Sequence, residues 1–227
     1  MKKLSILFLL LAATLANAQE HKGFGVSLRT GVSRATKIAT SQTSQSDLFI
    51  PNYGIGIFYD GHISKGLYYR GQVSFLSRNW KESYIPQVIC EIPFSPCPSY
   101  GPFYYQKQNY FVSPELSLMY QFGKRAIKPF LQAGLRFDFY LKSRIVSEEF
   151  PTNLVVETTW KKIDGYRNIN STAIISGGVN FKHLNLQIEY NPTLVSFINK
   201  EVYERGYLVR YSKLNIQTLS VVAGYRF

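Results

Sequence analysis

The chain has 227 residues, enough for one domain or two small ones. Apolar residues make up 45% of it and charged residues only 18%, below the roughly 25% usual for soluble globular domains, and this composition excludes wholesale disorder. The formal net charge is +12, but the basic residues form no stripe of the kind that binds nucleic acid, and two cysteines are too few for a four-cysteine zinc site.

The amino terminus has the layout of a secretory signal peptide. Two lysines form a basic head, an apolar run follows over residues 4–15, and Ala16-Asn17-Ala18 supplies a cleavage site. The run is shorter than the about 20 apolar residues of a membrane-spanning helix. No cysteine follows the cleavage site to carry a lipid anchor. We therefore predict a signal peptide over residues 1–18 and one mature domain over residues 19–227, folded beyond the inner membrane.

After the signal peptide, apolar residues recur with period two, which is typical of strands with one apolar and one polar face. In the last but one of these segments, Leu186 and Ile188 alternate with Gln187 and Glu189. Eight segments carry the pattern, in chain order 24–32, 53–60, 67–75, 110–122, 131–139, 172–181, 184–191 and 219–227.

The connections between these segments alternate in length. Short ones fall at about residues 61–65, 123–128 and 182–183, and long ones at about 34–51, 79–107, 143–167 and 199–210. Tight turns at one rim and loops at the other are the plan of an outer-membrane barrel. We predict an all-β fold, namely an eight-stranded antiparallel up-and-down transmembrane β-barrel in the outer membrane of a Gram-negative bacterium.

Alternation alone does not say which face points outward, because a soluble lipocalin-type barrel also has eight such strands. Several segments reach the about 9–11 residues that a tilted strand needs to cross a bilayer. The opposite face mixes Gly and Ser with charges of both signs, which suits the narrow interior of an eight-stranded barrel. Aromatic residues stand near the ends of the apolar runs, as at membrane interfaces: Phe24, Tyr53, Tyr59, Tyr69, Tyr110, Phe122, Tyr190 and Tyr225. These features favour an apolar face toward lipid.

The polar face carries the candidate site. We predict a salt-bridged network that fills the lumen, made by Arg29, Arg70, Glu115, Arg136, Asp138 and Glu189. The arginines are the expected counter-ions, because unpaired buried charges are costly. A small anion bound among them is the alternative that the pattern leaves open.

Three histidines, His21, His62 and His183, fall near the amino terminus or in predicted turns rather than in the loops. Histidine is the usual general base of serine chemistry. We therefore predict no catalytic residue, and the sequence indicates no cofactor or metal site.

Cys90 and Cys97 lie in the longest predicted connection, within a segment that also carries three prolines. In an oxidising compartment such a pair is expected to form a disulfide, and no nearby histidine completes a metal site. Two roles stay open for the ring: it presents apolar side chains to a partner, or it only resists proteases.

The signal peptide, the glycine-rich segment 23–32 and the final segment 221–227, Val-Val-Ala-Gly-Tyr-Arg-Phe, resemble the outer-membrane β-barrel domain proteins of Bacteroidetes that are often labelled PorT-like. The resemblance spans the mature chain through pattern rather than through a catalytic motif, and it implies no residue-level site. The most specific part resembles the carboxy-terminal signal that the barrel-assembly machinery captures: Leu219, Val221, Ala223, Tyr225 and Phe227.

Together these features predict a non-enzymatic outer-membrane barrel that acts through its extracellular loops as an envelope or complex component. Expected partners are outer-membrane lipid and lipopolysaccharide, the barrel-assembly machinery during biogenesis, and proteins that bind the loops. Two alternatives remain: an outer-membrane hydrolase or acyltransferase with a polar site at the loop end of the barrel, and a soluble secreted ligand-binding barrel.

Overall fold

The computed structural model describes residues 23–39, 43–45, 50–84, 103–123, 126–149, 154–162, 166–198, 202–203 and 210–227. Its regular elements are β1 (Gly23–Ala39), β2 (Thr43–Gln45), β3 (Ile50–Ser64), β4 (Leu67–Tyr84), β5 (Phe103–Gln121), β6 (Ile127–Glu149), β7 (Leu154–Lys161), β8 (Ile169–Phe181), β9 (Leu184–Asn191), β10 (Val202–Tyr203) and β11 (Arg210–Arg226). Among these residues, no helix has the length and apolar character needed to cross a membrane.

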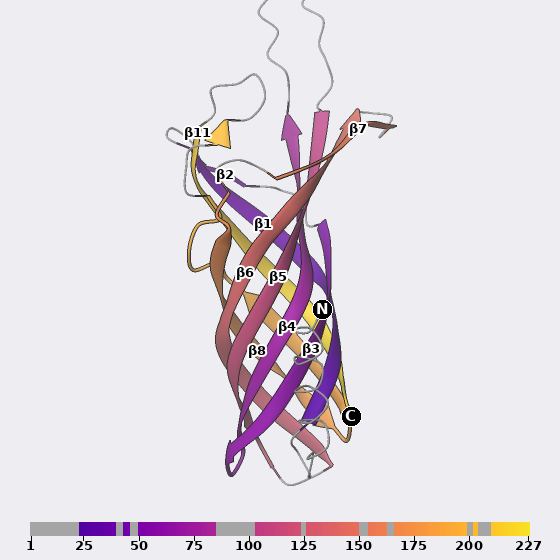
Figure 1. Ribbon diagram of the computed structural model, residues 1–227, viewed down its shortest axis with the longest axis vertical. Helices are drawn as coiled ribbons and strands as arrows, with labels where there is room; N and C mark the ends of the chain where they lie inside the picture. Colours follow the sequence, from indigo (N-terminus) through magenta and orange to yellow (C-terminus); the bar gives the residue numbers. More distant parts are fainter. Residues whose placement is uncertain are drawn as a thin grey trace, which may run out of the picture.

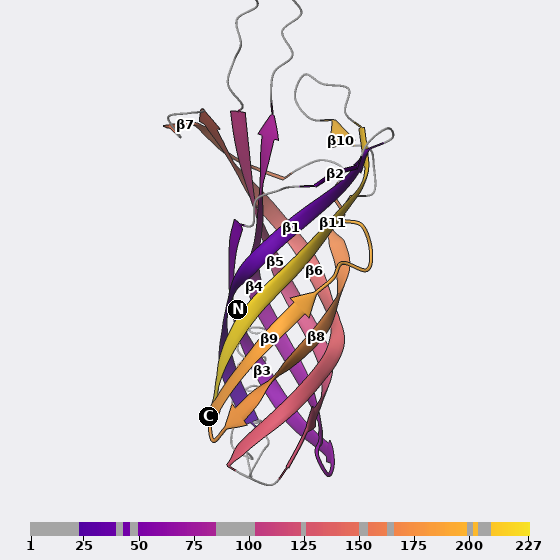
Figure 2. The same cartoon turned by 180° about the vertical axis from the view of Figure 1, so that it is seen from behind.

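Eight long strands form a closed antiparallel barrel (Figures 1 and 2). Their order around the wall is β11, β9, β8, β6, β5, β4, β3 and β1, and β1 pairs again with β11, in a ladder that begins with Gly25 opposite Arg226. The short strands β2, β7 and β10 pair with β1, β6 and β11 beyond the main wall, at the end where the long connections lie. The predicted eight-stranded antiparallel up-and-down β-barrel is confirmed.

The predicted boundaries at the loop end are wrong, because the strands run further. β4 continues to Tyr84 and β5 begins at Phe103, and β6 continues to Glu149, where β7 extends it as a hairpin. Backbone pairing needs no apolar side chains, so a ladder continues where the period-two pattern fades into polar residues. Figure 1 shows these strands rising above the rest of the wall.

The two faces of the wall are oriented as the alternation predicts. Ile188 on β9 points outward and is 62% exposed, whereas its neighbour Gln187 points inward and is 4% exposed. The outward rows of the other long strands are also apolar, with Leu28, Leu116 and Leu131 each at least 60% exposed. A soluble barrel would have the opposite arrangement, since exposed aliphatic rows are unfavourable in water.

Two glycines show how the chain makes room and turns. Gly25 points into the lumen, where a Cβ atom would lie 2.3 Å from the Phe58 ring and 2.4 Å from the Tyr225 carbonyl oxygen. Gly66 closes the tight β3–β4 turn with φ of +79°, a conformation that side chains with a Cβ rarely adopt. Glycine therefore lets bulky neighbours fill the narrow interior and keeps this rim short.

Candidate functional site: the charged lumen

The six charged side chains predicted for the lumen all point inward and are at most 8% exposed. The structure divides them between two clusters rather than one network. The central cluster consists of Arg29, Arg78, Glu115, Arg136, Asp138 and Glu189. The turn-end cluster consists of Asp60, Arg70 and Arg226.

Arg29 on β1 joins three strands in the central cluster. Its Nη1 and Nη2 atoms donate to the two carboxylate oxygens of Glu115 on β5 at 3.1 and 3.2 Å. Nη2 also donates to Glu189 on β9 at 3.1 Å. A guanidinium matches a carboxylate in this two-pronged geometry, so Arg29 ties opposite parts of the wall together across the lumen.

Asp138 on β6 is the second centre of the central cluster. Its carboxylate lies 3.1 Å from Arg78 Nη1 and 3.3 Å from Arg136 Nε. The hydroxyl groups of Ser113 and Thr172 donate to it at 2.6 and 2.8 Å. Four partners from β4, β5, β6 and β8 thus surround one buried carboxylate.

Arg136 connects the two halves of the central cluster, since its Nη1 atom donates to Glu189 at 3.4 Å and lies 3.8 Å from Glu115. Three arginines face three carboxylates, so the central cluster is formally neutral. This balance matters because each buried charge left without a partner would cost several kcal/mol.

The turn-end cluster fastens the end of the chain to the wall. Arg70 on β4 binds Asp60 on β3 through Nε and Nη2, at 2.7 and 3.0 Å. Arg226, the penultimate residue, donates to the second carboxylate oxygen of Asp60. The guanidinium of Arg70 also lies 4.3 Å from the centre of the Phe58 ring and donates to Asn185 on β9. One aspartate therefore links β3, β4 and β11.

Apolar layers lie on both sides of the charged clusters. We call the layer toward the loop end the apolar cap; it consists of Ala35, Trp80, Phe111, Tyr140, Tyr166, Phe197, Ile198, Leu214 and Ile216. Phe111 and Phe197 meet edge to face at 5.6 Å, and the Arg78 guanidinium lies 6.0 and 5.7 Å from their centres. At the turn end, Tyr68, Met119 and Phe130 form a smaller layer.

The irregular segment of residues 192–198, which follows β9, contributes Phe197 and Ile198 to the apolar cap. Pro192 cannot donate to the ladder, and beyond it the Thr193 hydroxyl both donates to and accepts from the Ile216 backbone, at 2.5 and 2.9 Å. The Ser196 hydroxyl accepts a hydrogen bond from the Leu214 N–H at 3.0 Å. Side chains thus replace part of the backbone pairing along β11, while the Phe197 N–H still donates to the Leu214 carbonyl oxygen and the Phe197 side chain is fully buried.

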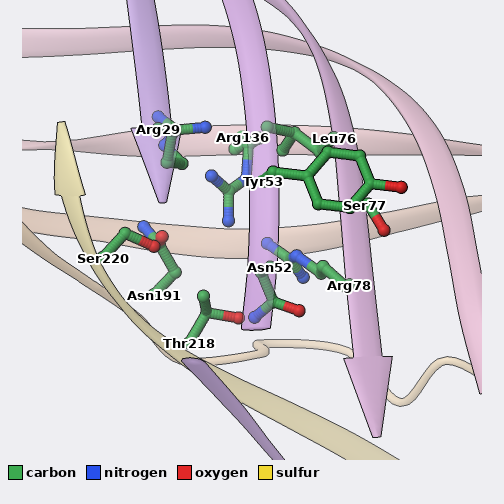
Figure 3. A pocket seen from close by; sticks show the side chains of 10 residues that line it. All are labelled: Arg29, Asn52, Tyr53, Leu76, Ser77, Arg78, Arg136, Asn191, Thr218 and Ser220. Atoms are coloured by element: carbon green, nitrogen blue, oxygen red, sulfur yellow. The ribbon is translucent and has the colours of Figure 1, made fainter. Parts of the chain in front are cut away.

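A cavity of about 10 Å³ lies beside the central cluster, close to the space that one water molecule needs. We call it the arginine cavity, because Arg29, Arg78 and Arg136 all line it. Figure 3 shows their side chains around it, together with Asn52, Thr218 and Ser220 from β3 and β11.

Sequence reasoning missed three charged residues of these clusters. Asp60 is buried on the inward face of β3, at the end of the segment 53–60, but it is not among the site residues predicted from the sequence. Arg78 lies beyond the segment 67–75, in which the alternation is clear. Arg226 lies on the inward face of the last strand, for which only the outward apolar residues were considered. Continuing the parity of each strand to its end would have found both arginines.

The remaining candidates lie apart from the lumen or outside the described residues. Cys90, Cys97 and His21 fall outside the described ranges. His62 and His183 are exposed at the turn end, where the His183 Nδ1 atom lies 3.0 Å from the Arg226 carbonyl oxygen. Leu219, Val221, Ala223, Tyr225 and Phe227 form the outward row of β11 and its end. Among the described residues, no group of three or more His, Cys, Asp and Glu side chains could hold a metal ion.

The comparisons with known proteins agree on architecture alone. No protein-family model matches the chain, and no curated protein matches its sequence. Solved structures that resemble it include Neisserial surface protein A (14% identity, 90% of this chain and 97% of that chain, TM-score 0.43). Others are the outer membrane enzyme PagL (13%, 89% and 99%, 0.46) and the outer membrane protein OprG from Pseudomonas aeruginosa (9%, 93% and 99%, 0.37). At these identities the likeness concerns the fold, and the resemblance to PorT-like proteins stays a prediction.

Proposed function

We propose that this chain is a non-enzymatic outer-membrane β-barrel protein whose lumen is closed by its own side chains and which acts through its loop end as an envelope or complex component. One observation carries the proposal: two clusters of ion pairs fill the lumen between two apolar layers. Ions and solutes have no wide aqueous path through such an interior, and barrels with open channels have about 16 strands or more. The protein would then act through its outer surface and its loop end rather than as a pore.

The outward rows support insertion in a lipid bilayer. Aliphatic side chains occupy the middle of the outer surface, as Leu28, Leu116 and Ile188 illustrate. Aromatic side chains gather near the turn end of the same surface, where Tyr120 and Phe122 meet edge to face with their ring centres 5.0 Å apart. Phenol and indole rings favour the boundary between hydrocarbon and headgroups. The proposed partners of this surface are outer-membrane lipid and lipopolysaccharide.

The loop end supports a role in contact with other molecules. β4, β5 and β6 extend past the apolar cap, and β7 adds a further pairing to β6 there. The proposed binding surface is made by these strand ends and the connections between them, including the Cys90–Cys97 segment, which we propose to be closed by a disulfide. Signal-peptide cleavage after Ala18, assembly through the final residues of β11 and membership of the PorT-like barrels belong to the same proposal.

The proposal is tested by cell fractionation, gel mobility and channel recording. The protein is expected in the outer-membrane fraction, with faster gel mobility before boiling than after, because folded barrels resist detergent. Purified protein in planar bilayers is expected to give no stable conductance steps. Recovery in the soluble fraction, or regular channel openings, would contradict the proposal.

The enzymatic alternative is tested with the same purified protein. Incubation with phospholipid and with lipopolysaccharide is expected to leave the acyl chains of both unchanged, as followed by mass spectrometry. Release or transfer of an acyl chain at a rate proportional to protein concentration would replace the proposed role with a hydrolase or an acyltransferase.

A further inference from the structure

The arginine cavity has a composition that its surroundings do not explain. Ten residues line it, all within the described part of the chain; three are arginines and none is acidic. Each of these arginines also has a carboxylate partner, and none of those carboxylate residues lines the cavity.

Several hydrogen-bond donors at the cavity have no partner within the described protein. They are Arg29 Nε, Arg78 Nη2, Arg136 Nη2 and Asn52 Nδ2. The hydroxyl oxygens of Thr218 and Ser220 are also without a partner there, and so is one acceptor, the amide oxygen of Asn191, so that donors outnumber acceptors. All of these residues are at least nine-tenths buried. A buried donor without an acceptor is unfavourable, and a charged donor more so, which means that the site is built to receive an acceptor.

We propose that the arginine cavity binds one small monatomic anion, for which chloride and bromide are the probes. The room of about 10 Å³ admits a single small particle and excludes tetrahedral anions such as phosphate or sulfate. An anion at this place accepts hydrogen bonds from guanidinium, amide and hydroxyl donors at once. The low dielectric of the interior strengthens its attraction to the three arginines.

The lining of the cavity supports an anion over a neutral occupant. Three guanidinium groups and no carboxylate line it. The central cluster is neutral as a whole, and the excess positive charge of the lumen lies in the turn-end cluster, so the preference for an anion rests on the groups that line the cavity. A water molecule could accept from some of the same donors, but it would interact less strongly with three guanidinium groups.

Bromide diffraction tests the site directly. Protein purified with bromide as the only halide is crystallised, and data are collected at the bromine absorption edge. The expected result is an anomalous peak among Arg29, Arg78 and Arg136. A peak for an ordered water in that place, without anomalous signal, would overturn the proposal, as would bromide bound only on the outer surface.

A pair of matched variants tests the site in solution. Ser220 and Ser176 are both buried, and both have hydroxyl groups without a partner in the described protein, but only Ser220 lines the cavity. Ser220→Val narrows the cavity, whereas Ser176→Val makes the same change on β8 away from it. The measurement is the unfolding temperature in detergent with chloride or gluconate at equal ionic strength.

For the wild type and Ser176→Val, we expect the unfolding temperature to rise by about 3–5 °C for each tenfold increase in chloride above the dissociation constant. For Ser220→Val we expect this rise to be lost. The same chloride effect in all three proteins would be a general salt effect and would overturn the proposal. If Ser220→Val does not fold, the anomalous signal in the wild type decides alone.

Discussion

Asp60 and Arg70 face each other across the β3–β4 ladder and bind through both carboxylate oxygens, at 2.7 and 3.0 Å. The same aspartate accepts a hydrogen bond from Arg226, so a residue near the turn end of β3 holds the end of β11. This contact lies beside the ladder between β1 and β11 that closes the barrel. The pairing therefore stabilises the closure of the wall as well as the charge balance of the lumen.

Asp60→Asn is expected to destabilise the barrel by about 3–5 kcal/mol, because it leaves the buried Arg70 and the partly buried Arg226 without their counter-ion. The measurement is urea unfolding in lipid vesicles, followed by tryptophan fluorescence and gel mobility. Arg226→Met is the control, since it leaves the Arg70 pair intact and is expected to cost clearly less. Equal losses of unfolding free energy for both variants would show that the pair of Asp60 with Arg70 adds nothing to the stability beyond the contact with Arg226.

Ile188→Arg is expected to cost about 2–4 kcal/mol and to reduce assembly in the outer membrane, because it places a charge against lipid near the middle of β9. Leu184→Arg, on the same face of the same strand at the turn-end rim, is expected to cost about 0–1 kcal/mol. The yield of folded protein in outer-membrane fractions measures the difference. Similar yields for the two variants would contradict the proposed position of the bilayer around the middle of β9.

Gly25→Ala is expected to cost about 1–3 kcal/mol, since the added atom overlaps the Phe58 ring and a backbone oxygen. Gly71→Ala is the matched control, because a Cβ there meets nothing within 4 Å, and it is expected to stay within about 0.5 kcal/mol of the wild type. Urea unfolding compares both with the wild type. A harmless Gly25→Ala would mean that Phe58 does not pack against the β1 backbone.

The two cysteines are expected to be oxidised to a disulfide in protein isolated from the outer membrane. Alkylation with iodoacetamide under denaturing conditions should add mass only after reduction. Peptide mapping should then place both labels in the segment between β4 and β5. Labelling without reduction would show free thiols and remove the constrained ring from the proposed binding surface.

The sequence predicts the eight strands and their outward faces because alternate residues are apolar on the outer surface of the barrel and polar in the lumen. The alternation of Ile188 with Gln187 can be recognised in the sequence without knowing which strands pair with β9. Strand length at the loop end was not predictable in the same way, since the apolar alternation fades there while the ladder of β4 with β5 continues through backbone hydrogen bonds.

The buried charges were partly predictable. The alternation of residues along each strand places six of them on the inward face. Which carboxylate binds which arginine depends on the stagger between strands. Arg70 was expected to join the other lumen arginines, whereas the register of β3 and β4 places it opposite Asp60 and leaves Arg78 to complete the central cluster. The cavity depends on the same stagger, together with the sizes of residues from six strands, and no single strand carries a signal for it.

The wall of the barrel is uneven in height. β9 has only eight residues and is followed by the irregular segment that holds Phe197, whereas β5 has 19 and β6 has 23. The flank from β4 to β7 therefore rises above the flank of β8 and β9. If the chain spans a bilayer as proposed, a neighbour in the same membrane would meet strand ends on the β4–β7 side at heights that the β8–β9 side does not reach.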